Sequence, residues 1–158
     1  QGRGIYPGTS SEMLLRDYAC VVCHPELQSR LGRSSRSNWQ GRLPLLHVDW
    51  EMQVDAAPTW ERWSAHNNIT DLDLIYGTRF SMEDHAVRAA LAGLGYALVT
   101  RVFVETNVRQ AQLIEATTVD MRMPTAFHHY VVHQLSSKQL REPVARFRNW
   151  LFDEAARD

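Results

Sequence analysis

A stretch of small residues between two apolar segments constrains the fold of this chain more than any other feature. Residues 82–93 are rich in Ala, and the apolar residues 96–99 follow shortly after them. Small side chains let a helix approach a sheet closely, and Gly93 or Gly95 can take the positive φ that ends the helix. With the apolar residues 72–76 before it, the stretch predicts a strand, a helix and a second strand in sequence.

The start of this predicted helix is the first candidate for a binding site. Ser81, followed three positions later by Asp84, is typical of a capping box, and the acidic Glu83 and Asp84 suit the positive end of a helix dipole. A helix that starts at the end of a strand presents backbone N–H groups that can hold an anion. We therefore expect an α/β domain with a small polar ligand near Ser81.

Length and charge limit the classes of function. The chain has 158 residues, 44% of them hydrophobic, and a formal net charge of −1, which fits one domain or two small lobes with a core. Its densest basic segment, residues 30–42, mixes arginines with Ser and Gly as solvated loops do, so DNA contact by this chain is not expected. No apolar run is long enough for a membrane span, and no signal peptide is recognisable. We expect a cytoplasmic protein without membrane contact.

The remaining segments alternate between helices and strands. Helices are expected over residues 59–66, with two tryptophans on one face, and from about residue 141 to 156, with Pro143 in the first turn. Residues 102–112 are expected to form a helical turn and a loop. The alternation is typical of parallel βαβ units. Apolar runs predict further strands over residues 14–24, 43–48, 113–114 and 128–134.

One cysteine motif has two interpretations. Cys20, Cys23 and His24 have the Cys-x-x-Cys-His spacing of covalent c-type haem attachment. On a strand, however, Cys20 and Cys23 face opposite sides, and buried thiols behave as small hydrophobic residues. We expect structural cysteines, with a c-type haem protein as the unfavoured alternative.

Other site chemistry finds little support in the sequence. His129 and His133 lie four apart on a predicted strand, which separates them by about 13 Å, too far to chelate one metal ion together. The sequence lacks a Gly-x-Ser-x-Gly motif, a phosphate loop and a dinucleotide-binding glycine pattern. We expect no metal site, no cofactor and no enzymatic activity.

Several motifs, in order along the chain, resemble the C-terminal effector-binding domain of LysR-type transcriptional regulators. The segment from Phe80 to Arg101 has that family's helix start, Ala-rich helix, Gly-Leu-Gly turn and apolar strand followed by Arg. Residues 2–8 and 147–151 resemble its glycine loop and its closing helix, and residues 21–27 resemble the strand that runs into its turn. Trp60-Glu61-Arg62-Trp63 points to the branch that contains the glycine-cleavage and β-lactamase regulators.

The resemblance implies an α/β fold with two lobes, like that of periplasmic binding proteins. Residues 1–24 would be a remnant of lobe one with a crossover strand, residues 25–127 lobe two, and residues 128–158 the return strand and C-terminal helix of lobe one. The family's first strands are not recognisable before Gln1, and neither are its linker helix and winged helix-turn-helix. We therefore expect an N-terminally truncated regulator with lobe one incomplete and lobe two intact.

The resemblance also implies which residues contact an effector. Arg101 is expected to supply a further charge or to form a surface ion pair. His129 and Tyr130 face opposite sides of their strand, so we expect only His129 in the cleft. In the family the contacts come from the helix start and from the strand returning to lobe one, which here correspond to Phe80, Ser81, Met82, Glu83, His129 and Tyr130.

These residues also have structural interpretations. Ser81 would serve as a helix cap, and Phe80 and Met82 would lie in the core. Glu83 would complement the helix dipole, and Tyr130 would only pack. Because the helix start is unusually acidic, a zwitterionic or amine effector is favoured over a dicarboxylate.

The sequence thus predicts an effector-sensing domain that binds a small polar metabolite in the interlobe cleft and controls a DNA-bound oligomer and its transcription. The implied partners are the effector, a second copy through lobe one, and DNA through a winged helix-turn-helix absent from this chain. A solute-binding protein of a transporter, which has the same fold, is the main alternative.

Overall fold

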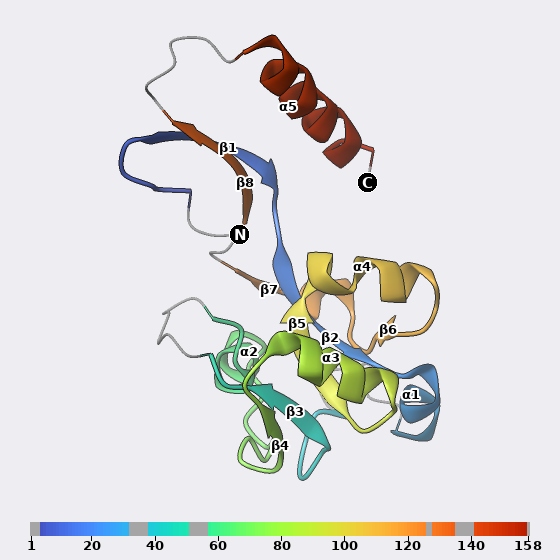
Figure 1. Cartoon of the computed structure of the whole chain (residues 1–158). Helices are drawn as coiled ribbons and strands as arrows, with labels where there is room; N and C mark the ends of the chain where they lie inside the picture. Colours follow the sequence, from blue (N-terminus) through green and yellow to red (C-terminus); the bar gives the residue numbers. More distant parts are fainter. Residues whose placement is uncertain (1–3, 32–37, 51–56, 126–127, 135–140, 158) are drawn as a thin grey trace. The chain divides into compact units, whose positions relative to one another are not determined.

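The computed structural model divides the chain into two compact units (Figure 1). One consists of residues 1–17 and 126–158, and the other of residues 18–125. The lobe boundaries expected from the sequence stay a prediction. The structure describes residues 4–31, 38–50, 57–125, 128–134 and 141–157.

The larger unit is built on a six-stranded sheet with parallel and antiparallel parts. The three neighbouring strands at one side are parallel to each other, as the predicted βαβ pattern requires, and the next strand runs antiparallel to them. The strand order is β4 (Gly77–Phe80), β3 (Leu45–Val48), β5 (Tyr96–Thr100), β2 (Tyr18–Cys23) and β6 (Ile114–Glu115), with β7 (Met123–Pro124) also paired to β2.

Two hydrophobic clusters cover the two faces of this sheet. The small alanines of α3 (Glu83–Leu91) pack on one face with Cys20 and Val22, while Val21 and Cys23 belong to the other cluster. This division follows from the alternation of side chains along β2. The unit also contains α1 (Pro25–Leu31), α2 (Trp60–His66) and α4 (Arg101–Arg109).

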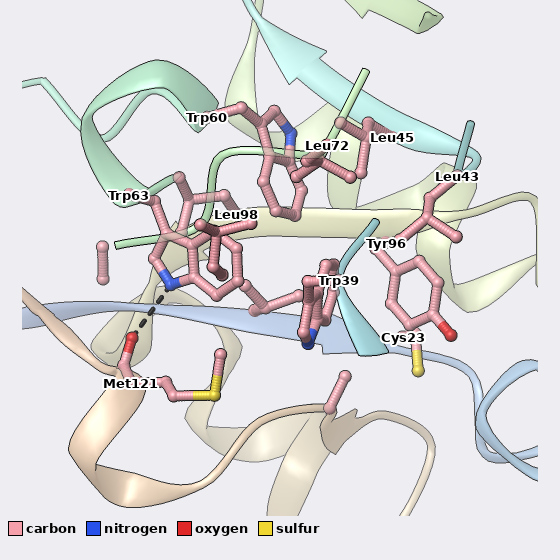
Figure 2. Packing of buried hydrophobic residues seen from close by; sticks show 14 of the residues in the cluster. Cys23, Trp39, Leu43, Leu45, Trp60, Trp63, Leu72, Tyr96, Leu98 and Met121 are labelled. Carbon is pink, nitrogen blue, oxygen red and sulfur yellow. Dashed lines mark hydrogen bonds between the residues drawn. The ribbon is translucent and has the colours of Figure 1, made fainter. Parts of the chain in front are cut away.

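Aromatic rings form the centre of the second cluster (Figure 2). Trp39 lies with its ring centroid 5.0 Å from that of Trp63 and 4.9 Å from that of Tyr96, both in edge-to-face geometry. Trp60 and Trp63 are both buried, so the predicted apolar face of their helix is confirmed. Their indole N–H groups donate to the carbonyls of Leu46 (3.1 Å) and Met121 (2.9 Å), which satisfies the polar atoms of two buried rings.

The helix α3 ends where the sequence predicts but starts differently. Gly93 has a φ of 74°, and the Leu94 N–H donates to the Ala89 carbonyl (3.0 Å), as at many glycine-terminated helices. Met82 is the N-cap, with no capping hydrogen bond from its side chain. The prediction that Ser81 caps the helix is therefore wrong, because the helix begins one residue later.

Three other predicted elements need correction. The strand expected over residues 72–76 is wrong, because Asp73 accepts hydrogen bonds from the N–H groups of Ile75 and Tyr76 (both 3.2 Å) in a tight turn, and the strand follows at β4. The helical turn expected at the start of residues 102–112 is longer than predicted, because residues 102–109 belong to α4, and a turn follows at residues 110–112. The single strand expected over residues 14–24 is two strands, β1 (Thr9–Leu15) and β2, which belong to different units.

The smaller unit pairs two strands and adds one helix. The strand β1 runs antiparallel to β8 (His129–Gln134), with an irregularity between Met13 and Leu15. The helix α5 (Glu142–Ala155) has Pro143 in its first turn, as predicted. None of its described side chains is buried, and the exposed rings of Phe147 and Trp150 stack on each other.

No helix among the described residues is long and apolar enough to cross a membrane.

The two cysteines lie where the sequence predicts structural residues. Cys20 and Cys23 have no exposed surface and belong to clusters on opposite faces of the sheet. Burial raises the pKa of the Cys23 thiol to about 12, so it stays protonated. Because both thiols would have to reach one haem, this geometry does not favour the haem alternative.

Candidate functional site

The carboxyl ends of three parallel strands meet at one edge of the larger unit. The strands β3, β4 and β5 end at Val48, Phe80 and Thr100. The N–H of Asp49 donates to the Phe80 carbonyl (2.8 Å), which joins the first two ends. In open α/β sheets this edge is where ligands bind, so it is the candidate site.

Four of the sequence-predicted residues lie together at this edge. Phe80 is half-buried against the cluster that includes the alanines of α3. Ser81 and Met82 are exposed, with 57% of the Met82 surface accessible. Phe80 thus contributes to packing, while Ser81 and Met82 are open to solvent at the start of α3.

The fourth residue, Glu83, is held by the neighbouring strand. Its carboxylate accepts hydrogen bonds from the N–H (2.7 Å) and the hydroxyl (3.1 Å) of Thr100, the last residue of β5 and the N-cap of α4. The carboxylate therefore lies near the positive ends of both α3 and α4, which stabilises its charge. This anchoring fixes the start of α3 to the end of β5.

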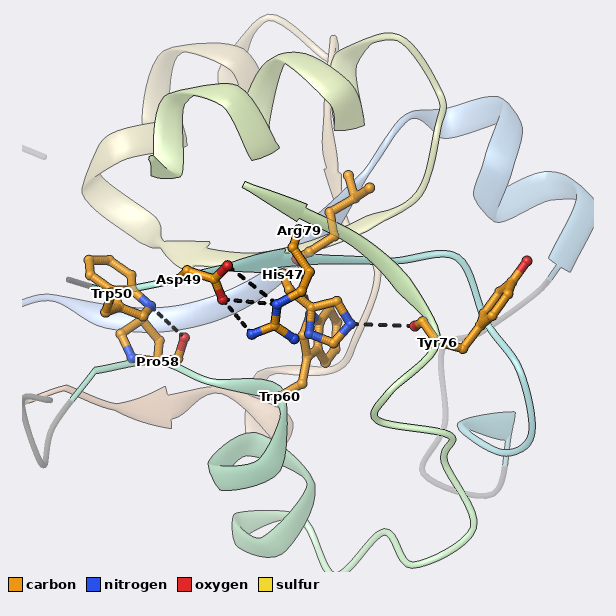
Figure 3. A network of polar contacts seen from close by, with 8 residues as sticks. His47, Asp49, Trp50, Pro58, Trp60, Tyr76 and Arg79 are labelled. Atoms are coloured by element: carbon orange, nitrogen blue, oxygen red, sulfur yellow. Dashed lines mark hydrogen bonds and ion pairs between the residues drawn. The ribbon is translucent and has the colours of Figure 1, made fainter. Parts of the chain in front are cut away.

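An exposed ion pair lies at the ends of β3 and β4 (Figure 3). The Arg79 Nε–H donates to both oxygens of Asp49 (3.0 and 3.3 Å), and its Nη2 also donates to Asp49 Oδ1. The hydrogen bond from Arg79 holds the pKa of the Asp49 carboxyl below its usual range. Neither residue was predicted from the sequence, although Asp49 directly follows a predicted strand, which is a signal that points to it.

The buried side chain of His47 lies near this ion pair. The His47 ring is buried, with its Nε2 3.4 Å from the Tyr76 carbonyl oxygen. Together with Trp60 and Arg79 it lines a pocket of about 40 Å³. Such a volume has room for about one or two water molecules, so it is smaller than a metabolite needs.

Arg101 stands at the start of α4, just after β5. It forms ion pairs with Glu115 (3.0 Å) and with Glu105, and about 16% of its side chain is exposed. Glu115 also pairs with Arg122 (2.8 Å), whose guanidinium lies 4.5 Å from the centre of the Tyr18 ring. Of the two interpretations of Arg101, the structure therefore shows the ion pair.

His129 and Tyr130 belong to the smaller unit. His129 Nε2 lies 3.3 Å from a carboxylate oxygen of the buried Asp17. The Tyr130 ring packs on the backbone of Gly4, where an added Cβ would lie 2.5 Å from a ring carbon. The two side chains thus have separate environments, as the alternation along β8 predicts.

Residues suited to a metal are dispersed. Within the described ranges, no three His, Cys, Asp or Glu side chains are grouped so as to hold a metal ion. The candidate site itself offers an exposed helix start, an anchored carboxylate and an ion pair, which are groups that form hydrogen bonds and charge interactions.

Curated relatives of this chain are regulators of transcription. The transcriptional activator AmpR of Citrobacter koseri is 27% identical over 150 residues, which cover 95% of this chain and 47% of the relative. The glycine cleavage system transcriptional activator of Escherichia coli K12 is 26% identical over 156 residues, covering 98% and 48%. This chain thus spans about half the length of the curated relatives it matches, and no family model matches it.

Solved structures of regulators of transcription share the fold of this chain. The effector domain of AmpR from Pseudomonas aeruginosa superposes with a TM-score of 0.71 at 20% identity, covering 98% of this chain and 69% of that domain. The full-length LysR-type regulator HypT of Salmonella typhimurium matches with a TM-score of 0.59 at 13% identity, covering 97% of this chain and 48% of HypT. The expected α/β fold of two-lobe, periplasmic-binding-protein-like domains is therefore confirmed.

Relatives and fold together agree with the resemblance seen in the sequence: this chain is homologous to LysR-type regulators of transcription and has the fold of their effector-binding domains.

Proposed function

We propose that this chain is the effector-sensing domain of a LysR-type regulator that binds a small polar metabolite and thereby controls transcription. The observation that carries the proposal is the start of α3, anchored through Glu83 and Thr100 at the carboxyl edge of three parallel strands. Anchoring removes part of the ordering cost of ligand binding, since the helix start is already fixed. The relatives, all named as regulators of transcription, support the same function.

The charges at this edge suit a zwitterion. The exposed Ser81 and the first turn of α3 would hold a carboxylate, because the helix dipole favours an anion there. Glu83 supplies negative charge near it, and the Asp49 carboxylate, about half exposed beside its partner Arg79, would accept a hydrogen bond from an amine. We therefore keep the preference for a zwitterionic or amine effector over a dicarboxylate.

The remaining functions belong to the whole regulator and are part of the proposal. A second lobe would contribute Tyr130 or, as we favour, His129, so that the metabolite binds in an interlobe cleft. The regulator would oligomerise through lobe one, contact DNA through a winged helix-turn-helix outside this chain, and act in the cytoplasm without catalysing a reaction. A metabolite would shift the regulator only if it bound one arrangement of the oligomer more tightly than another.

A solute-binding protein of a transporter is the less favoured function. It would share the fold, but the relatives that match 95% and 98% of this chain are transcriptional activators.

Thermal unfolding with a library of amino acids, amines and organic acids tests the proposal. A ligand at a hundred times its Kd adds about 2.7 kcal/mol of stability, which raises Tm by about 5 to 10 °C for a chain of this size. Ser81→Ala should reduce this shift, whereas Ser29→Ala, which changes an exposed serine of α1, should leave it intact. A shift that survives Ser81→Ala unchanged would contradict the proposed site.

A further inference from the structure

A second and larger pocket lies at the opposite edge of the same parallel strands. Its volume is about 640 Å³, within the range of about 300 to 1,000 Å³ for ligand pockets. It is lined by the segments that precede β3, β4 and β5, and so lies at their amino ends. Gly77, which also lines it, is held close to the neighbouring strand, because a Cβ there would lie 2.1 Å from the Leu45 carbonyl oxygen.

An exposed arginine with one ion-pair partner lines this pocket. The Arg42 Nε–H donates to a carboxylate oxygen of Asp73 (3.1 Å), and its guanidinium carbon lies 5.3 Å from the centre of the Tyr76 ring. The ring of Tyr76 points away from the His47 and Arg79 group at the other edge (Figure 3). Of the N–H groups of the Arg42 guanidinium, only the Nε–H donates a hydrogen bond to another described residue. The two Nη groups are therefore left for a ligand.

The backbone around Arg42 is fixed as well. The Gly41 N–H donates to the Asp71 carbonyl (2.6 Å), and the Asp73 N–H donates back to the Gly41 carbonyl (2.9 Å). Asp73 also accepts the N–H groups of Ile75 and Tyr76, so its carboxylate lone pairs are largely used by the protein. Asp73 therefore positions Arg42 and the turn, and a ligand carboxylate would meet the guanidinium rather than a free acid.

Exposed apolar side chains line the same pocket as the charged group. Ile75 is 90% exposed, Leu94 64% and Tyr76 48%, and all three line the pocket. Large apolar side chains grouped in this way at one pocket are typical of a binding surface. They offer contact to an apolar body about the size of one ring or one branched alkyl chain.

We propose that this pocket is a second binding site, for a monocarboxylate with an apolar body, such as an aryl or branched alkyl acid. The paired Nη groups of Arg42 bind the carboxylate in bidentate fashion, and Leu94 and Ile75 contact the apolar body. The site is independent of the effector site proposed above, since it shares no residue with the start of α3.

Fluorine NMR titration of this chain with 4-fluorophenylacetate tests the proposal, with 4-fluorophenylacetamide as the uncharged counterpart. The acid should bind saturably, and the amide should bind at least about tenfold more weakly, because a bidentate bond to a charged group is lost. Arg42→Gln should weaken binding of the acid by at least about tenfold for the same reason. Arg109→Gln, which removes an exposed arginine of α4, and Ser81→Ala should leave the Kd unchanged.

Leu94→Ser gives a second test, because Leu94 is exposed and its loss does not threaten the fold. It should weaken binding about threefold or more through lost apolar contact. Equal affinity for acid and amide, an Arg42→Gln variant that binds as tightly as the wild type, or the absence of saturable binding would each overturn the proposal.

Discussion

The carboxylate of Glu83, in the first turn of α3, accepts two hydrogen bonds from Thr100, one from the backbone N–H at 2.7 Å and one from the hydroxyl at 3.1 Å. This contact joins the helix to the end of the following strand, on the edge where ligands bind in α/β sheets. It explains how an acidic residue is tolerated at a proposed effector site: its charge is used to hold the site together.

Glu83→Ala should therefore destabilise the chain by about 1–3 kcal/mol, because it leaves the part-buried Thr100 N–H without a charged acceptor. Urea unfolding measures the change. Glu61→Ala is the matched control, since Glu61 is an acidic residue in the first turn of α2 and is exposed. Equal losses in the two variants would mean that the contact with Thr100 adds nothing beyond the helix dipole.

The ion pair of Asp49 with Arg79 predicts a dependence of stability on pH. The hydrogen bond from Arg79 lowers the pKa of Asp49 in the folded state below the unfolded value of 3.8. The contribution is therefore fully present above about pH 5, and it is lost as the pH falls through the lowered folded pKa. The stability difference between wild type and Asp49→Asn in urea should shrink over this acidic range, and a constant difference would exclude the linkage.

The buried thiols should not react in the folded chain. Cys20 and Cys23 have no exposed surface, and the pKa of Cys23 is raised to about 12 by burial, so little thiolate forms at neutral pH. A chromogenic disulfide reagent should label them only as fast as the chain unfolds, and both at once in concentrated urea. Rapid labelling of either cysteine without urea would contradict the packing of β2.

The aromatic cluster predicts unequal effects for two tryptophans. Trp63→Phe removes the hydrogen bond to the Met121 carbonyl and part of a fully buried ring, and should cost about 1–3 kcal/mol. Trp150→Phe, on the exposed face of α5, should change stability by less than about 0.5 kcal/mol. Similar losses of stability in the two variants, measured by urea unfolding, would contradict the position of Trp63 in the core.

Sequence patterns identified the elements whose side chains repeat with a clear period. The end of α3 and the strand β5 could be predicted because small residues precede a glycine that adopts a positive φ and apolar residues follow it. The strand β4 could not, since Gly77, Thr78 and Arg79 are exposed and carry no apolar alternation. It forms because β3 offers an edge for pairing, which is information from elsewhere in the chain.

The polar contacts of the site could not be predicted from the sequence, for a related reason. Glu83 and Thr100 are separated by 17 residues, and Asp49 and Arg79 by 30, so only the folded sheet brings each pair together. The residue types at strand ends were visible in the sequence, but their partners were not. The pocket at Arg42 also depends on the turn at Asp73, which an apolar run concealed.

A metabolite is expected to bind where the parallel strands end and α3 begins. Amide NMR of this chain, titrated with the ligand that most raises Tm, locates the bound metabolite. Chemical-shift changes should concentrate at Asp49, at residues 79–84 and at Thr100, and Ser81→Ala should weaken them. Saturable shifts that leave this edge unchanged and concentrate elsewhere in the chain would contradict it.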